Sequence, residues 1–444
     1  MKKSTSFNRR AFIKTSVTGT MASSLLMKSP VGSAITSHCE DPVVIKEYRT
    51  LGRTGFKVSD IGMGAGNLTN PSVLRAAFDM GINYIDTAEH YGGGQSERAI
   101  GDALKGIDRK KIFITSKLNL DYFGGSSKDE LKTRFHKILE RLQTPYVDCL
   151  MIHMAQSAEQ LKHTDFHEMA LEMRAEGKLK YLGLSNHGPE HRLAGNMKEP
   201  MEKVVLAAAE DGRFDVVLFV YNFIQKEQGE RIIKACKEKS IGLTLMKVDP
   251  ISFNTGIKSM LEEARQDGRE IPESIHQMKD EYEEWIRLGD AFMEQYNLKT
   301  EREIRDAAIR FVLTNPDIHA VCPTISNFES LDTFVRLSGQ RLIDTEARML
   351  NEYQESRSQS YCRHACGTCE PACPHHIPIN TILRYNHYFE AHGREKHAMQ
   401  KYAKLQIPSE LPCKDCTGFC IPVCPHHIPI QLLLLNAHTN LLMT

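Results

Sequence analysis

The feature that most constrains the fold is a regular alternation of short apolar runs with longer amphipathic segments, between about residues 48 and 337. The apolar runs have the length and the β-branched content of buried strands. They are Ser59–Met63, Ile82–Asp86, Ile112–Lys117, Val147–His153, Leu179–Ser185, Phe214–Tyr221, Gly242–Met246 and Ala320–Pro323. The segments between them have apolar residues at helical spacing, most clearly in Ser96–Leu104, Lys128–Leu142, Phe166–Glu176, Glu227–Lys239 and Glu301–Leu313.

This alternation predicts an α/β fold, a (β/α)8 TIM barrel. Strands that alternate with helices form parallel sheets through right-handed crossovers, and eight such units close a barrel. An open doubly wound sheet is the competing fold. It is disfavoured because the glycines of Gly62-Met63-Gly64-Ala65-Gly66 do not have the spacing of a dinucleotide-binding turn.

Two segments fall outside the alternation. Leu51–Val58 predicts a hairpin with Arg-Thr-Gly in its turn, ahead of the first barrel strand. Pro250–Lys299 is long, charged and helical in pattern, and it follows the seventh strand. It is either a lid or docking surface on the active face of the barrel, or a solvated helical insertion.

Polar side chains close three successive strands. Asp86 ends the second run and Tyr91 follows it in a glycine-rich turn, while Lys117 ends the third run and His153 the fourth. Because the carboxyl ends of parallel strands meet at one rim, these groups are expected to lie together. A phenol with a pKa of about 10 is a poor acid at neutral pH unless its phenolate is stabilised. The pattern therefore predicts Tyr91 as general acid, with Lys117 beside it to stabilise the phenolate.

These residues resemble the aldo-keto reductase family. Asp86-Thr87-Ala88 with Tyr91-Gly92, followed by Ser96-Glu97-Arg98, is similar to the family's active-site signature, and Lys117 and His153 stand at its next two catalytic positions. The resemblance implies that Asp86 holds Lys117 and that His153 orients a carbonyl oxygen.

The resemblance also implies the reaction and its cofactor. A barrel domain over residues 48–340 would bind NADP (or NAD) and transfer hydride between it and a small carbonyl or alcohol substrate. The implied cofactor-binding residues are Ser185, Asn186, Tyr221, Lys247, Ser326 and Asn327.

Three departures from the family pattern lie at the expected cofactor site. Leu218 stands where the family usually has a glutamine, Thr324 stands where it usually has a glycine, and no Arg or Lys lies between Pro323 and Leu331. A second hypothesis therefore stays open: a non-catalytic or partner-dependent electron-transfer subunit whose barrel binds nucleotide.

Eight of the twelve cysteines lie beyond residue 360, in two sets of four. The sets are Cys362, Cys366, Cys369 and Cys373, and Cys413, Cys416, Cys420 and Cys424. Each set ends in Cys-Pro and continues into the same His-His-Ile-Pro-Ile, at His375–Ile379 and His426–Ile430. This repetition predicts an internal duplication with two equivalent sites.

The cysteine pattern resembles that of bacterial ferredoxins, in which thiolates hold 4Fe–4S clusters. It implies a small ferredoxin-like domain of helices and loops over residues 345–444 with two clusters. Each Cys-Pro cysteine would serve the other cluster, so that Cys424 joins the first set and Cys373 the second. Tetrahedral zinc and disulfides are the alternatives. The paired histidines are expected in exposed loops, and Thr381–Leu405 is expected to form one amphipathic spacer helix.

The remaining cysteines are scattered. Cys149, Cys236 and Cys322 lie in apolar contexts and are expected to be buried small hydrophobic residues. Cys39 lacks the neighbours of a lipid-anchor cysteine.

The N-terminus predicts where the protein acts. Asn8-Arg9-Arg10-Ala11-Phe12-Ile13-Lys14 resembles a twin-arginine export signal, so that residues 1–34 are expected to form a signal peptide that is removed and the protein to be periplasmic. A disordered basic tail is the alternative. Proteins with such signals are exported after they have folded, and this order is compatible with a cofactor that is inserted before export.

Charge and hydropathy limit the partners. Basic and acidic residues both number 56, and no basic stripe indicates nucleic acid. No apolar run is long enough for a membrane span. A small-molecule substrate and a redox partner protein are the expected partners.

Overall fold

The computed structural model describes residues 42–120, 125–187, 199–251, 279–358, 361–364, 366–405, 407–408 and 410–442. The chain divides into two compact units, Met1–Pro42 and Val43–Thr444. The predicted signal peptide, Cys39 and much of the Pro250–Lys299 segment lie outside the described residues.

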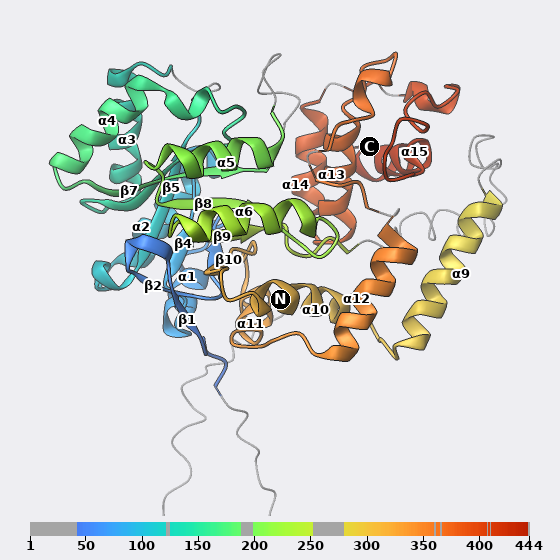
Figure 1. Ribbon diagram of the computed structural model, residues 1–444, viewed down its shortest axis with the longest axis horizontal. Helices are drawn as coiled ribbons and strands as arrows, with labels where there is room; N and C mark the ends of the chain where they lie inside the picture. Colours follow the sequence, from blue (N-terminus) through green and yellow to red (C-terminus); the bar gives the residue numbers. More distant parts are fainter. Residues whose placement is uncertain are drawn as a thin grey trace, which may run out of the picture. The chain divides into compact units, whose positions relative to one another are not determined.

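Eight parallel strands lie side by side in chain order, from β3 to β10 (Figure 1). They are β3 (Met63–Gly64), β4 (Tyr84–Asp86), β5 (Phe113–Leu118), β6 (Val147–Ile152), β7 (Leu179–Asn186), β8 (Val216–Val220), β9 (Gly242–Met246) and β10 (Ala320–Val321). Parallel bridges join Ile61 to Val321 and Gly64 to Thr324. These bridges join the two edges of the sheet, so the predicted barrel is confirmed and the open doubly wound sheet is wrong.

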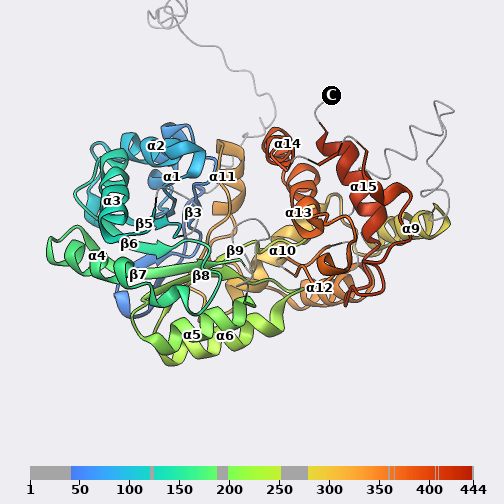
Figure 2. The same cartoon turned by 90° about the horizontal axis from the view of Figure 1, so that it is seen from above.

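Helices surround the strands (Figure 2). They are α1 (Pro71–Asp79), α2 (Gln95–Leu104), α3 (Lys128–Leu142), α4 (Thr164–Ala175), α5 (Met201–Asp211), α6 (Lys226–Glu238), α10 (Glu301–Thr314) and α11 (Phe328–Val335). Strands β5, β6 and β8 are buried along their whole length, as expected for strands with helices on one face and the barrel interior on the other. The five predicted helices are present, with ends within two residues of those expected.

The hairpin before the barrel is also present, with β1 (Tyr48–Thr50) antiparallel to β2 (Lys57–Ser59). The first strand prediction was misplaced, because Ser59 pairs with Tyr48 in this hairpin and the barrel strand begins only at Met63. Gly55 ends the turn between β1 and β2 with φ of 70°, a conformation that favours glycine.

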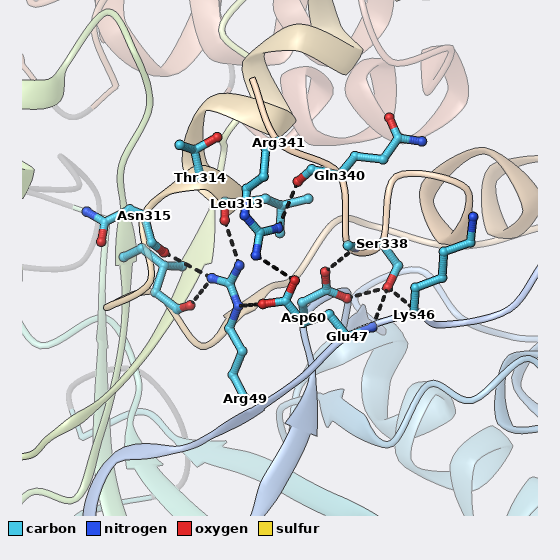
Figure 3. A network of polar contacts seen from close by, with 12 residues as sticks. Lys46, Glu47, Arg49, Asp60, Leu313, Thr314, Asn315, Ser338, Gln340 and Arg341 are labelled. Atoms are coloured by element: carbon cyan, nitrogen blue, oxygen red, sulfur yellow. Dashed lines mark hydrogen bonds and ion pairs between the residues drawn. The ribbon is translucent and has the colours of Figure 1, made fainter. Parts of the chain in front are cut away.

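A buried arginine ties this hairpin to the last part of the barrel (Figure 3). Arg49 donates hydrogen bonds to the carbonyl oxygens of Leu313 at 2.6 Å and Asn315 at 3.0 Å, and its Nε donates to Glu47 at 2.8 Å. Arg49 is only 8% exposed. The carbonyl oxygens at the end of α10 therefore accept hydrogen bonds from a residue more than 260 positions earlier in the chain.

Helix α12 (Asp344–Arg357) follows the barrel, and α9 (Lys279–Gln295) is the described part of the long charged segment. The C-terminal module comprises α13 (Ile379–Glu390), α14 (Glu395–Ala403) and α15 (Ile430–Leu441). These helices bury their own apolar core together with five of the cysteines. The single helix expected over Thr381–Leu405 is wrong, because Gly393 adopts φ of 56° and separates α13 from α14.

The internal duplication appears in the backbone. His376 and His427 have φ of 52° and 51°, and both lie in the turn after a Cys-Pro pair. The N–H of Ile379 donates to Ile377 and that of Ile430 donates to Ile428, each at 2.8 Å. Each copy then enters a twelve-residue helix, α13 or α15. Of the paired histidines, His426 is half-buried and the other three are exposed.

Among the helices that the structure describes, none is long and apolar enough to cross a bilayer.

Candidate functional site

The four side chains predicted to act together meet at the carboxyl ends of adjacent strands. Asp86 is the last residue of β4, Lys117 lies near the end of β5, and His153 directly follows β6. Tyr91 begins a short 3-10 turn, Tyr91–Gly94, in which Gly92 and Gly93 have φ of 58° and 65°. These two glycines let the chain reverse immediately after Tyr91 and bring it back toward the rim.

Lys117 is the centre of the group. Its Nζ lies 2.6 Å from Oδ1 of Asp86 and donates to the carbonyl oxygen of Thr87 at 2.8 Å. The amine also shares a side-chain hydrogen bond with Tyr91, and Nζ lies 5.0 Å from the centre of the tyrosine ring. Lys117 is fully buried and Asp86 is 4% exposed. The structure thus brings amine, carboxylate and phenol together, as the sequence predicts.

Burial and pairing act in opposite directions on this ion pair. Burial alone would lower the pKa of Lys117, but the Asp86 carboxylate and the Tyr91 phenol outweigh it and raise that pKa above its usual 10.5. Burial raises the pKa of Asp86, and the neighbouring ammonium opposes this rise. Lys117 therefore stays charged at neutral pH.

His153 completes the group as a neutral imidazole. Its ring centre lies 5.8 Å from that of Tyr91, with the two planes at 79°. Burial and the nearby Lys117 ammonium hold the pKa of His153 well below its usual 6.5. Its Nδ1 is buried and has no hydrogen-bond partner among the described residues. A neutral ring of this kind donates one hydrogen bond without bringing a second cation to the site.

Several neighbours of the site were not singled out from the sequence. The ring of His90 stacks on His153 with centres 4.7 Å apart, and His187 lies 6.5 Å from His153. His364 lies 5.8 Å from His187, although it comes from the cysteine-rich region. Their positions in the sequence were signals: His90 lies inside the Asp86–Tyr91 motif, and His364 lies between two cysteines of one set.

Two carboxylates, half-buried Glu89 and buried Glu97, hold the surrounding loops. Glu89 forms an ion pair with Arg134, whose Nε donates to it at 3.0 Å. Glu97 is fully buried, accepts from Ser116 at 2.7 Å and pairs with Arg141 at 2.6 Å. These pairs connect the segment after β4 to α3 and thereby support the turn that carries Tyr91.

Two of the predicted cofactor residues end strand β7. Ser185 Oγ accepts from the backbone of Met154 at 3.1 Å, and Asn186 donates to the carbonyl of Ala155 at 2.7 Å. Both side chains are buried beside the loop that follows His153. They lie at the same rim as Asp86, Lys117 and His153.

The other predicted cofactor residues lie on different elements of the barrel. Ser326 and Asn327 are exposed at the start of α11, where Asn327 caps the helix by accepting from the Ser330 N–H at 2.8 Å. The N-terminus of a helix suits the phosphates of a nucleotide. Lys247 follows β9, and its Nζ lies 2.7 Å from Nε2 of His364.

Tyr221 directly follows β8. It is 3% exposed, and its ring lies 5.7 Å from that of Phe311. The ring also presses on α6 so closely that a Cβ on Gly229 would come within 2.2 Å of it. Tyr221 therefore packs between β8 and the helices outside it. Leu218, at the position of the missing glutamine, packs in the apolar cluster inside the barrel.

All eight C-terminal cysteines are described, and none forms a disulfide. Electrostatic neighbours link each Cys-Pro cysteine to the other repeat: Cys362 and Cys369 lie near Cys424, and Cys413 and Cys420 lie near Cys373. Cys420 also lies near Cys369 and Cys424, so the two sets are adjacent. Hydrogen bonds reach the sulfurs, including one from Asn380 to Cys362 at 3.1 Å. Among the described residues, no three His, Cys, Asp or Glu side chains are arranged so that they could hold one metal ion.

Comparison with known proteins adds the following. The model of the aldo/keto reductase family matches residues 62–355, which end before the first cysteine set. Aldo-keto reductase YhdN of Bacillus subtilis is 23% identical over 328 residues, 70% of this chain and 94% of its own length. L-galactose dehydrogenase of Arabidopsis thaliana is 32% identical over 154 residues, 31% of this chain and 48% of its own length.

Solved structures are similar over the same region. The holo form of aldo-keto reductase AKR11C1 from Bacillus halodurans is 21% identical with a TM-score of 0.49, over 69% of this chain and 95% of its own. An aldo-keto reductase from Klebsiella pneumoniae in complex with NADPH is 19% identical with a TM-score of 0.48, over 72% of this chain and 99% of its own.

We predict that Lys117→Met destabilises the protein by about 3–5 kcal/mol, because it leaves the Asp86 carboxylate buried without its ammonium. The remaining carboxyl would have a pKa raised by burial, so it favours the folded state only while protonated. Stability should therefore fall as pH rises through that pKa. Urea unfolding at several pH values measures this effect.

The control is the double variant Asp86→Asn/Lys117→Met, which removes both charges. It should be more stable than Lys117→Met at pH above neutrality and lack the added pH dependence. Equal unfolding midpoints for the single and double variants at every pH would mean that the ion pair does not have this role.

Proposed function

The chain belongs to the aldo/keto reductase family and is an oxidoreductase of that type, and on this premise we propose that it interconverts a small carbonyl compound and its alcohol with NADP or NAD. The observation that carries the proposal is the contact of Lys117 Nζ with both the Asp86 carboxylate and the Tyr91 phenol. This arrangement is what a phenol needs in order to act as a proton donor at neutral pH.

The side chains present fit a bound nicotinamide nucleotide. Ser185 and Asn186 place buried polar groups at the rim beside His153, and the exposed start of α11 provides backbone N–H groups for a phosphate. When bound, the nicotinamide would supply or accept the hydride. The choice between NADP and NAD stays a prediction, since no Arg or Lys lies between Pro323 and Leu331.

The protein side of the reaction follows from the site. During reduction the carbonyl oxygen gains negative charge, and the neutral His153 ring orients it by hydrogen bonding. Tyr91 transfers its phenolic proton to that oxygen. The Lys117 ammonium stabilises the phenolate that remains, and Asp86 keeps the ammonium in place. In the alcohol-oxidising direction the phenolate takes the proton back.

We predict that Tyr91→Phe lowers kcat for carbonyl reduction by about 10²–10⁴-fold, because it removes the proton donor and keeps the ring. Tyr146→Phe is the matched control, since the Tyr146 ring packs against Arg109 away from the rim and its loss should leave the rate unchanged. Consumption of NADPH or NADH with an aromatic aldehyde gives the rates. Wild-type activity in Tyr91→Phe would rule out the proposed acid.

We propose further that the C-terminal cysteines hold two 4Fe–4S clusters, which would store and pass single electrons. The donors support this in type and number, with eight thiols in two repeats of four. The electrostatic contacts of Cys362 with Cys424 and of Cys413 with Cys373 agree with the exchange between the repeats.

Cysteine variants test both the clusters and the exchange. Anaerobically purified protein should contain iron and acid-labile sulfide in equal amounts. Cys362→Ser/Cys424→Ser should lose about half of the iron, since both residues belong to one cluster, whereas Cys362→Ser/Cys373→Ser should lose nearly all of it. Zinc in place of iron would refute the clusters. Equal losses in the two double variants would refute the exchange.

The second candidate function is an electron-transfer subunit that binds nucleotide and depends on a partner protein. Leu218 favours it, because an apolar side chain packed in the barrel interior cannot make the amide contact usual at that position. In that case a redox partner would reduce the clusters equally well in wild type and in Tyr91→Phe, and neither protein would reduce a carbonyl.

We also propose that the protein is exported to the periplasm through the twin-arginine route. The paired Arg9 and Arg10, followed by Phe-Ile-Lys, support it. Replacing both with lysine should keep the full-length protein in the cytoplasm of a bacterial host, as cell fractionation would show. Periplasmic protein from this variant would contradict the route.

A further inference from the structure

The ring of His153 is held differently from the other side chains of the catalytic group. Its backbone is fixed, because the His153 N–H donates to the carbonyl oxygen of Leu118 at 2.8 Å and its carbonyl oxygen accepts from Asn119 at 3.3 Å. The residue is 2% exposed, and its Nδ1 has no hydrogen-bond partner among the described residues. A functional histidine commonly has its ring fixed by a hydrogen bond to one ring nitrogen. Here packing must fix the plane of the ring instead.

Three aromatic rings lie against that of His153. The ring of His90 is stacked on it, with centres 4.7 Å apart and planes at 24°. Tyr91 and His187 approach edge-on, at 79° and 77°, with their centres 5.8 and 6.5 Å away. Stacked and edge-on pairs at such separations each favour one relative orientation. Of the three rings only that of His90 is stacked, so it has the largest influence on the plane of His153.

The segment that carries His90 is itself fixed. The Glu89 N–H donates to the carbonyl oxygen of Lys117 at 3.3 Å, and the carbonyl oxygen of His90 accepts from Gly93 at 3.0 Å. The His90 ring also packs edge-on against Tyr91, with centres 5.2 Å apart. His90 therefore has a defined position relative to both the amine and the phenol, and it can impose that position on the ring stacked on it.

We propose that His90 is a positioning residue, whose stacked ring fixes the plane in which His153 presents Nε2 to the carbonyl oxygen of the substrate. The inference deepens the reductase function proposed above and rests on it. A buried N–H without an acceptor is costly, so the neutral His153 ring carries its proton on Nε2 rather than on Nδ1. Without the stack the ring would rotate, and this donor would point away from the oxygen in part of the molecules. Such misalignment lowers kcat.

Two apolar variants of His90 separate the flat ring from the volume that it fills. His90→Leu fills the space without a flat ring and should lower kcat for an aromatic aldehyde about three- to tenfold, with KM for NADPH changed less than about twofold. His90→Phe keeps a ring that can stack, and its kcat should stay within about twofold of wild type. His136→Leu is the matched control. His136 lies on α3 and contacts Lys178, which precedes β7, so both constants should stay unchanged.

Crystal structures of the same proteins give a readout that needs no turnover. The His153 ring should keep its orientation in wild type and in His90→Phe, and it should rotate or adopt two conformers in His90→Leu. An unmoved His153 ring in His90→Leu would overturn the proposal. Equal losses of kcat in His90→Leu and His90→Phe would do so too, because they would assign the role to the imidazole nitrogens of His90. If the wild type reduces no carbonyl, the reductase function fails, while movement of the ring in His90→Leu alone still supports the positioning role.

Discussion

The buried pair of Lys117 and Asp86 is the interaction on which the rest of the site depends. Asp86 pairs with Thr115 in the register of β4 and β5, and Lys117 lies two residues further along β5 on the same face. The long lysine side chain can therefore reach back to the carboxylate at 2.6 Å. Two charges buried so deeply are tolerated only because they neutralise each other. This pairing keeps the ammonium charged where the phenol of Tyr91 needs it.

The C-terminal module is connected to this site as well as to its own core. Its helices bury an apolar cluster that includes five cysteines, and the same turn occurs in both repeats. His364 comes from this module, yet its Nε2 lies 2.7 Å from Nζ of Lys247, which follows β9. A barrel that ended at α11 would lack this side chain. The module thus adds an imidazole group beside the rim of the barrel.

Local patterns predicted most elements of the fold and failed where non-local pairing decides. Lys128–Leu142 was predicted with the ends that α3 has, because apolar residues at helical spacing are a local signal. The first barrel strand was misplaced because Ser59 prefers its antiparallel partner Tyr48. The spacer was predicted as one helix because amphipathic spacing continues through Gly393, whose left-handed φ ends it. The cofactor role expected for Tyr221 stays a prediction, and its ring fills the space that Gly229 leaves on α6.

By itself, the sequence determined the order of strands and helices, the four residue types at the strand ends and the duplication of the cysteine sets. These are properties of period, spacing and identity, which need no knowledge of distant contacts. Only the tertiary structure decided that the barrel closes, through the bridges from Ile61 to Val321 and from Gly64 to Thr324. It also placed the ring of His364, from the cysteine-rich region, 5.8 Å from that of His187. Such neighbours arise when the whole chain packs, because burial brings together groups that no local pattern relates.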